Sequence, residues 1–294
     1  MAAALPAFLI EVSFYLFAMF ESTRAAFARI RGRRSQAALL WISALIPYAV
    51  FALAAGTFTR NGFYLLAMLT AVFAFWHAVL PRRFAYDVGF LAIAAAPVVL
   101  RVFQRIYVSP DPHLRVDVLG HLMWIRLGVI ALLVLREWQP GPFSLWPQAS
   151  EWRSGLIWFA VFILPIAGVA IGTHDVQFGL AHGTWIDIVA IAAGTFLGGL
   201  WVIALSEELF FRGVIERALL NQWSSPLPAI LISALIFGSA HLWFHAFPNW
   251  KRACTAAVLG IACGVVYWRS GSVRAPMVTH AMVITTWRVF FNKS

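Results

Sequence analysis

Long apolar stretches separated by short polar connections are the feature that most limits what this chain can fold into. Many stretches run for about 20 residues, the length that an α-helix needs to cross a hydrocarbon layer roughly 30 Å thick. Of the 294 residues, 62% are hydrophobic and 12% are charged, whereas a soluble domain carries roughly 25% charged residues. A soluble core of this size could not bury so much apolar surface. The sequence therefore predicts an all-α, polytopic integral membrane helical bundle whose apolar surface contacts the lipid bilayer.

The pattern predicts about ten transmembrane segments. The fifth and the tenth segments contain histidine and arginine, so we expect these two segments to be tilted, interfacial or buried among other helices. Glu11 lies inside the first apolar run and no basic segment precedes that run, which indicates a retained first span rather than a cleaved signal peptide. The spans are predicted near residues 3–21, 36–56, 62–80, 85–103, 119–136, 155–172, 186–206, 227–245, 253–268 and 274–291.

The net charge of +10 comes mainly from arginines in the short connections. Arginine in short loops is typical of the cytoplasmic side of a membrane protein, whereas a nucleic-acid-binding protein gathers basic residues on one soluble face. We therefore exclude nucleic acid as a partner. The densest basic cluster, residues 24–34, predicts a cytoplasmic first connection. The expected location is a plasma membrane, the inner membrane of a bacterium, with multiple passes.

A polar connection rich in tryptophan, proline and glycine divides the chain. Tryptophan favours the headgroup level of a bilayer, so residues 138–154 are interpreted as an interfacial linker. It separates an N-terminal multi-span unit of unknown role, residues 1–137, from a C-terminal catalytic unit, residues 155–294. In the second unit, the pairs Gly194–Gly198 and Gly260–Gly264 have the spacing that lets helix backbones approach closely in lipid.

The run Ser-Glu-Glu-Leu-Phe-Phe-Arg at the end of the seventh predicted span contains a cluster of ionisable residues. Each such residue at membrane depth costs roughly 2.5–3.5 kcal/mol, so a cluster predicts a functional site. On a helix, Glu208 and Arg212 share a face and can pair, whereas Glu207 points about 100° away. Desolvation makes a carboxylate a stronger base. Glu207 is therefore a candidate general base, and a simple charge cluster at the helix end is the alternative.

Two histidines at membrane depth follow on later segments. His241 comes four residues after Phe237, and the small residues between them leave room for another helix or for a substrate. His245 follows one turn later, nearer the end of the span, and carries less weight. His280 lies in the last span. A lone buried histidine is more often a packed core residue, but Glu207, His241 and His280 on consecutive polar segments indicate one shared site.

These residues resemble the CPBP family of intramembrane proteases, which includes the CAAX prenyl endopeptidases and related Abi- and Rce-type members. Glu-Glu-Leu-Phe-Phe-Arg fits the motif Glu-Glu-x-x-x-Arg, and Phe-Gly-Ser-Ala-His fits Phe-x-x-x-His; the similarity covers residues 155–291. The resemblance implies an intramembrane endopeptidase of the CAAX or bacteriocin-processing type. It implies that Glu207 activates a water that His241 positions, and that His280 stabilises the oxyanion. The implied supporting residues are Glu208, Arg212 and Phe237.

The sequence departs from the family pattern at Ile284, where an asparagine commonly follows the third-motif histidine by four residues. Isoleucine cannot donate a hydrogen bond, and losing one oxyanion donor can cost about 10²–10³ in rate. Either another group, such as Thr285 or a residue on a neighbouring helix, replaces it, or the protein is a slow or lapsed enzyme. A non-catalytic immunity or scaffold protein and a transporter with a Glu/His relay therefore stay open as alternatives.

The adjacent glutamates and the arginine fit a metal-free base better than a metal site, so no cofactor is expected. If the protein depends on a metal, Glu207, His241 and His280 would form a three-ligand zinc set with an open position. There is no His-Glu-x-x-His or Gly-x-Ser-Gly run, which disfavours a site-2-type zinc protease and a rhomboid protease. The expected partner is a membrane-proximal or lipidated peptide substrate approaching from the cytoplasmic side. The sequence does not identify it.

Overall fold

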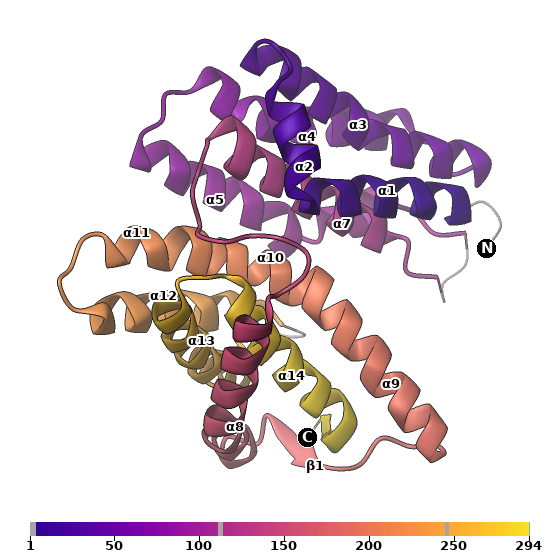
Figure 1. Cartoon of the computed structure of the whole chain (residues 1–294). Coiled ribbons are helices and arrows are strands. Elements are labelled where there is room, and N and C mark those ends of the chain that lie inside the picture. The colour runs from indigo at the N-terminus through magenta and orange to yellow at the C-terminus, as the bar shows by residue number, and fades with distance from the viewer. Residues whose placement is uncertain (1–3, 111–113, 245–246, 294) are drawn as a thin grey trace. The chain divides into compact units, whose positions relative to one another are not determined.

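Helices form almost the whole chain in the computed structural model, which describes residues 4–110, 114–244 and 247–293 (Figure 1). Seven of its helices are long and apolar enough to cross a membrane, or up to eight if one bent helix pair forms a single span. This confirms an all-α polytopic bundle. Each of the ten predicted segments coincides with helix, but the predicted count of ten spans is not confirmed.

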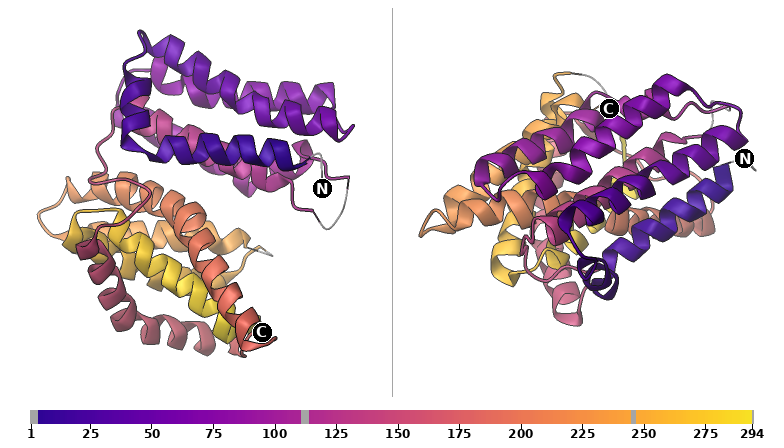
Figure 2. Two further views of the ribbon diagram at one scale, coloured as in Figure 1. Left: turned by 45° about the vertical axis from the view of Figure 1, so that its right-hand side comes forward. Right: turned by 90° about the horizontal axis from the view of Figure 1, so that it is seen from above.

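The chain divides into two compact units, and the first, called unit 1, comprises Met1–Trp138. Its helices α1 and α2 meet at a bend of 86°. Helix α3 packs against α4, while α7 packs against α1, α3 and α4 (Figure 2). The elements are α1 (Ala4–Met19), α2 (Glu21–Ala28), α3 (Arg33–Ala54), α4 (Arg60–Val79), α5 (Phe84–Val99), α6 (Val102–Ile106), α7 (Asp117–Ile130) and the π-helical η1 (Ala131–Leu135).

Buried ion pairs join the helices of unit 1. Arg126 on α7 donates from Nε to Glu11 Oε1 at 2.9 Å and from Nη2 to Glu11 Oε2 at 3.2 Å. The Nη1 atom of Arg126 donates to Ser43 Oγ on α3 at 2.8 Å. Arg136 makes an equivalent two-bond contact with Asp87 of α5, at 2.6 and 2.8 Å. Because each carboxylate oxygen of Glu11 and Asp87 has a guanidinium partner, these charges are compensated within the helical bundle.

The second compact unit, called unit 2, comprises Gln139–Ser294. Helix α8 begins at Ala149, so it includes the last part of residues 138–154, which the sequence assigned to a linker. The elements are α8 (Ala149–Gly172), β1 (Val176–Phe178), α9 (Trp185–Gly198), η2 (Gly199–Ala204), α10 (Leu205–Glu208), η3 (Leu209–Glu216), α11 (Arg217–Leu220), α12 (Pro226–Ala240), the 3₁₀ turn η4 (His241–Trp243), α13 (Trp250–Ser270), α14 (Arg274–Phe290) and β2 (Phe291–Lys293), which pairs antiparallel with β1.

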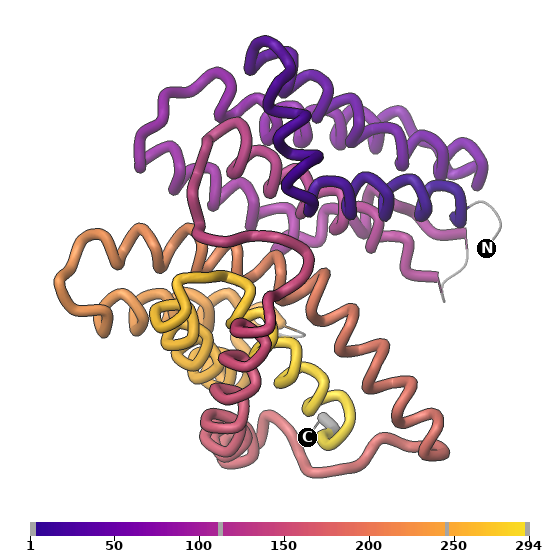
Figure 3. Tube along the Cα trace, viewed as in Figure 1, coloured from indigo at the N-terminus to yellow at the C-terminus, as the bar shows by residue number. Residues whose placement is uncertain are grey.

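One continuous helical path of 36 residues, Trp185–Leu220, carries the Glu-Glu motif of unit 2 at the middle of its second half and is called the central helix below (Figure 3). The predicted span near residues 186–206 is therefore too short, because the helix continues past the polar motif. Two π-helical segments, η2 and η3, flank the four-residue α10. A π-helix has a wider hydrogen-bonding step than an α-helix and often marks a functional site. Here it changes the direction in which the motif residues project.

The close packing of α13 against α12 and η3 involves both glycines of one predicted Gly-xxx-Gly pair. A Cβ added at Gly260 would lie 2.9 Å from Ala234 Cα, and one added at Gly264 would lie 2.8 Å from Glu216 Oε2. By contrast, no atom of the part of the chain that the structure describes, beyond the helix's own neighbouring backbone, lies within 4 Å of a Cβ added at Gly194 or Gly198. Only the second Gly-xxx-Gly pair therefore acts as the sequence predicted, by letting helix surfaces approach closely.

Helix α14, which carries His280, lies among α8, α9 and α13 and is buried along its first two turns. This agrees with the expectation for the last predicted span. Its start is fixed to α8 by Arg274, whose Nε lies 2.9 Å from Glu151 Oε2. The Ser272 hydroxyl also donates to Glu151 Oε1 at 2.5 Å. These contacts set the position of α14 along α8.

Candidate active site

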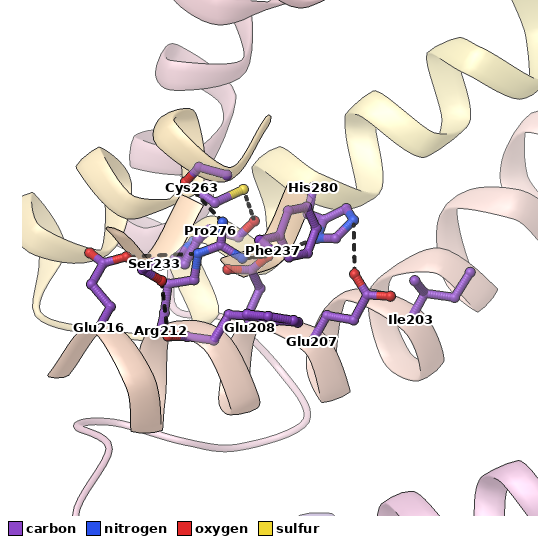
Figure 4. A network of polar contacts seen from close by, with 12 residues as sticks. Ile203, Glu207, Glu208, Arg212, Glu216, Ser233, Phe237, Cys263, Pro276 and His280 are labelled. Atoms are coloured by element: carbon purple, nitrogen blue, oxygen red, sulfur yellow. Dashed lines mark hydrogen bonds and ion pairs between the residues drawn. The ribbon is translucent and has the colours of Figure 1, made fainter. Parts of the chain in front are cut away.

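The two adjacent glutamates of the first motif occupy different environments on α10. The side chain of Glu208 is fully buried, whereas that of Glu207 is 31% exposed. The helical step of about 100° between neighbours explains the difference, because it turns Glu208 into the bundle and Glu207 toward its edge. In Figure 4, Glu208 lies between Arg212 and His280, while Glu207 extends beside Ile203.

Arg212 fixes the buried carboxylate, as the four-residue spacing predicted. Its Nη1 donates to Glu208 Oε1 at 3.0 Å, and its Nη2 donates to the carbonyl oxygen of Gly260 on α13 at 2.9 Å. The guanidinium also stacks over the ring of Phe237, with 4.8 Å between Cζ and the ring centroid. Arg212 is fully buried. It therefore connects the long central helix with α12 and α13.

His280 contacts both glutamates. Its Nδ1 lies 2.7 Å from Glu208 Oε1, and its Nε2 lies 3.8 Å from Glu207 Oε2. A carboxylate only accepts hydrogen bonds, so Nδ1 carries the proton in the contact with Glu208. This contact fixes the ring and aims Nε2 toward Glu207. The family resemblance implied a supporting role for Glu208, but it did not predict this contact between residues 72 positions apart.

His241 joins the site through Phe237. Its Nδ1 lies 2.9 Å from the carbonyl oxygen of Phe237, one turn earlier. The ring of Phe237 lies 4.7 Å from the His241 ring and 5.8 Å from the His280 ring, centroid to centroid. The motif phenylalanine therefore contacts both histidines and Arg212. His245 lies outside the described residues.

Glu216 is a buried acid that the sequence analysis did not single out. It follows Arg212 by four residues on the same helix, and its Oε2 lies 4.0 Å from Arg212 Nε. Its side chain is fully buried, and neither carboxylate oxygen has a hydrogen-bond partner among the described residues. The repeated four-residue spacing Glu208, Arg212, Glu216 was the signal that could have identified it.

Ile284 occupies the position where the family pattern has asparagine, and its side chain lies against the backbone at Gly199. Ile284 Cγ2 lies 3.7 Å from the point where a Cβ on Gly199 would lie. The hydroxyl of Thr285, considered as a substitute donor, donates to the carbonyl oxygen of Ala281 at 2.8 Å. In this structure, Thr285 therefore uses its proton within its own helix.

The arrangement differs from the metal set that the sequence left open. Among the described residues, the three potential ligand atoms that lie within 4.8 Å of one another belong to Glu208, Cys263 and His280. Glu207, His241 and His280 do not form such a group. A cation beside Glu208 would also face the Arg212 guanidinium, which already binds the same oxygen at 3.0 Å. Charge repulsion makes this buried set a poor metal site.

Comparison with known proteins assigns this region to a family. Residues 189–285 match the family model described as "Type II CAAX prenyl endopeptidase Rce1-like". The match runs from α9 into α14 and includes every residue of the Glu, His and His set. The match covers about a third of the chain and supports its assignment to the Rce1-like, CAAX-protease family. No curated protein and no solved structure matches the chain.

The similarity to the Rce1-like family indicates the class of chemistry. The family consists of CAAX-type intramembrane endopeptidases, so the class of activity is peptide hydrolysis. Together with seven apolar helices, it identifies the chain as an integral, multi-pass membrane protein. A substrate of this class is a peptide or a prenylated protein. The match does not extend to unit 1.

Proposed function

We propose that the protein is an intramembrane endopeptidase that cleaves a membrane-proximal or lipid-anchored peptide with a water activated by Glu207. The observation that carries the proposal is the contact chain from Arg212 through Glu208 to His280, which ends 3.8 Å from Glu207. A fully buried arginine and glutamate hold the histidine, and the histidine faces a partly exposed carboxylate. An oriented histidine beside a carboxylate that water can reach is suited to general acid–base chemistry.

In this mechanism, Glu207 takes a proton from the water, and the hydroxide adds to the carbonyl carbon of the scissile peptide bond. The electron pair of the carbonyl moves to its oxygen, and His280 stabilises that oxyanion through Nε2–H when the ring is doubly protonated beside Glu208. Collapse of the intermediate breaks the C–N bond. The proton held by Glu207 passes to the leaving nitrogen, which restores the carboxylate.

His241 has a separate role in the proposal. Its Nδ1–H donates to the carbonyl oxygen of Phe237, because a carbonyl only accepts. The neutral ring then has a lone pair on Nε2, which can accept a hydrogen bond from the attacking water. His241 would thus position the water, while Glu207 removes its proton. The two histidines differ because one is fixed by a carboxylate and the other by a backbone carbonyl.

The cytoplasmic approach of the substrate stays a prediction from the arginine-rich loops. Within unit 2, α12 starts next to α11 and runs to His241, and α13 returns to Arg269. His241 therefore lies at the end of α12 opposite the end that carries Arg217 and Arg269. Glu207 and His280 lie between these ends. If the arginine-bearing end is cytoplasmic, a cytoplasmic substrate must reach the interior of the bundle to meet all three groups.

The test is cleavage by purified protein in proteoliposomes, with mass-spectrometric detection of products from prenylated CAAX peptides and unprenylated membrane-proximal peptides. We expect Glu207→Gln to lower kcat by at least about 10³-fold, because an amide cannot accept the proton from water. His241→Ala should lower it by about 10²-fold or more. Trp268→Phe on α13 is a matched control at an exposed position. Equal turnover by wild type and Glu207→Gln would refute the mechanism.

Other outcomes separate the alternatives. Binding of a peptide without cleavage by wild type would favour an immunity or scaffold protein. Proton-coupled solute uptake abolished by Glu207→Gln, without cleavage, would favour a transporter. Loss of cleavage after chelation, with rescue by Zn²⁺ alone, would favour the zinc version with Glu207, His241 and His280 as ligands.

A further inference from the structure

Trp287 carries a buried hydrogen-bond donor without a partner. Its indole Nε1 is covered, and no acceptor contacts it among the described residues. The ring packs against the cluster that contains Phe211 and Phe237, and it lies 4.9 Å from the Phe291 ring. Burying an N–H group without an acceptor lowers stability, and buried tryptophan nitrogens usually have a partner. The unpaired donor therefore needs an explanation.

The helix places this donor on the same face as His280. Seven residues make about 700°, so Trp287 lies about 20° short of two full turns from His280, and roughly 10 Å along the axis. Side chains on a helix lean toward its N-terminus, which brings the indole back toward His280. Ile284 lies between the two on the same face. Trp287 thus belongs to the wall that His280 and Phe237 share.

The hydroxyls of α14 near this face, and the two Nη atoms of Arg212, are already engaged. The hydroxyls of Thr285 and Thr286 donate to the carbonyl oxygens of Ala281 and Met282, each at 2.8 Å. Arg212 uses Nη1 and Nη2 for Glu208 and Gly260. Among the described residues of α14, Trp287 Nε1 is therefore the buried side-chain donor that is free to meet a ligand.

We propose that Trp287 donates its Nε1–H to the carbonyl oxygen of the scissile peptide bond of the substrate. This rests on the proposed peptidase function and adds a second oxyanion donor to it. His280 Nε2 donates only while the imidazole is doubly protonated, whereas the indole N–H donates at every pH. The ligand is then a peptide backbone, whose carbonyl becomes a stronger acceptor as water adds to it.

The experiment compares kcat and KM of wild type and Trp287→Phe in the proteoliposome assay. Phenylalanine keeps an aromatic ring but removes the donor. We expect kcat to fall by about 10²-fold with KM changed less than about threefold, because the bond is stronger in the transition state than in the bound substrate. The plateau of the pH–rate profile should fall without a shift of its midpoints, since no titrating group is lost. Thermal stability should be equal or higher.

A hydrogen-bond donor introduced at residue 284, between His280 and Trp287, distinguishes a catalytic role of the Trp287 N–H group from a role of its ring in packing. Ile284→Asn in the Trp287→Phe background should restore kcat to within about tenfold of wild type, because it places an amide N–H on the same face. Trp268→Phe should leave kcat unchanged. Cleavage that depends on Glu207 but is unaffected by Trp287→Phe, or affected only in KM, would overturn the inference and leave the proposed function intact. Absence of any Glu207-dependent cleavage would overturn both.

Discussion

Both units bury charged side chains among their helices, but the carboxylates of unit 1 described above are compensated more fully than those of unit 2. Glu11 and Asp87 each give both carboxylate oxygens to one guanidinium. In unit 2, one oxygen of Glu207, one of Glu208 and both of Glu216 have no hydrogen-bond partner among the described residues. Unit 1 also has unpartnered buried atoms in its described part, but they belong to two tyrosine hydroxyls and one histidine ring.

This difference separates structural charges from reactive ones. A buried carboxylate whose oxygens are both occupied cannot accept a proton without losing an ion pair, so its contribution is to helix arrangement. A carboxylate with a free oxygen keeps the capacity to bind water or to take a proton. We expect substitutions in unit 1 to change stability, and substitutions in the motif region of unit 2 to change activity.

The largest expected effect comes from Glu208→Gln. It removes the carboxylate that fixes His280 and leaves the buried Arg212 without its closest counter-charge. We expect kcat/KM to fall by about 10³-fold and the free energy of unfolding to fall by roughly 3–5 kcal/mol. Peptide cleavage and thermal unfolding in detergent measure the two effects. Trp268→Phe is the control, because Trp268 is exposed and lies outside the motif region. Activity of Glu208→Gln within tenfold of wild type would contradict the oriented-histidine model.

Arg126→Met tests whether the compensated buried charges of unit 1 contribute to stability and not to activity. It leaves Glu11 buried without a counter-charge, so we expect a loss of roughly 3–5 kcal/mol in the free energy of unfolding. Cleavage per folded molecule should stay within about twofold of wild type. The double variant Glu11→Leu/Arg126→Met should recover most of the lost stability, since apolar residues can replace a buried ion pair. A loss of kcat in the folded single variant would instead tie unit 1 to catalysis.

The smallest expected effect concerns Glu137, an exposed residue of unit 1. The hydrogen bond from Arg82 holds the pKa of Glu137 below its ordinary value. The resulting stabilisation is present above that ordinary value and is lost as the pH falls through the lower pKa of the folded state. Because the side chain is 58% exposed, we expect about 0.5 kcal/mol at most. Unfolding of wild type and Glu137→Gln between pH 7 and about pH 3 should show this difference disappear.

The apolar stretches were sufficient to predict a polytopic helical bundle, because span length follows from bilayer thickness. The apolar stretches did not predict where the central helix ends. The polar run after residue 206 resembles an interfacial loop in composition, yet Glu208, Arg212 and Glu216 compensate one another inside the bundle. A hydropathy scale assigns one value to each residue regardless of its neighbours. It therefore cannot identify a charged side chain that is buried because an opposite charge lies one helical turn away.

The sequence identified residues of the candidate site, but it predicted few of the contacts between them. The four-residue spacing gave the Glu208–Arg212 pair, which the structure contains. The contact between Glu208 and His280 depends on how α14 packs, and packing is fixed by distant residues such as Glu151 and Arg274. The spacing of residues within one helix does not show how that helix is positioned along its neighbours. The catalytic roles of Glu207, His241 and His280 stay predictions.

Because of the two π-helical segments beside α10, the number of residues in the central helix determines the direction in which its side chains project. Removing one residue from η2 would let the chain close ordinary α-helical bonds, but it would turn the helix before it by about 100° relative to the glutamates. A substitution in η2 changes one side chain, whereas a deletion re-aims every residue on one side of it. Among homologous sequences, insertions and deletions should therefore be absent from residues 199–216 and accumulate in the connections on either side of α12.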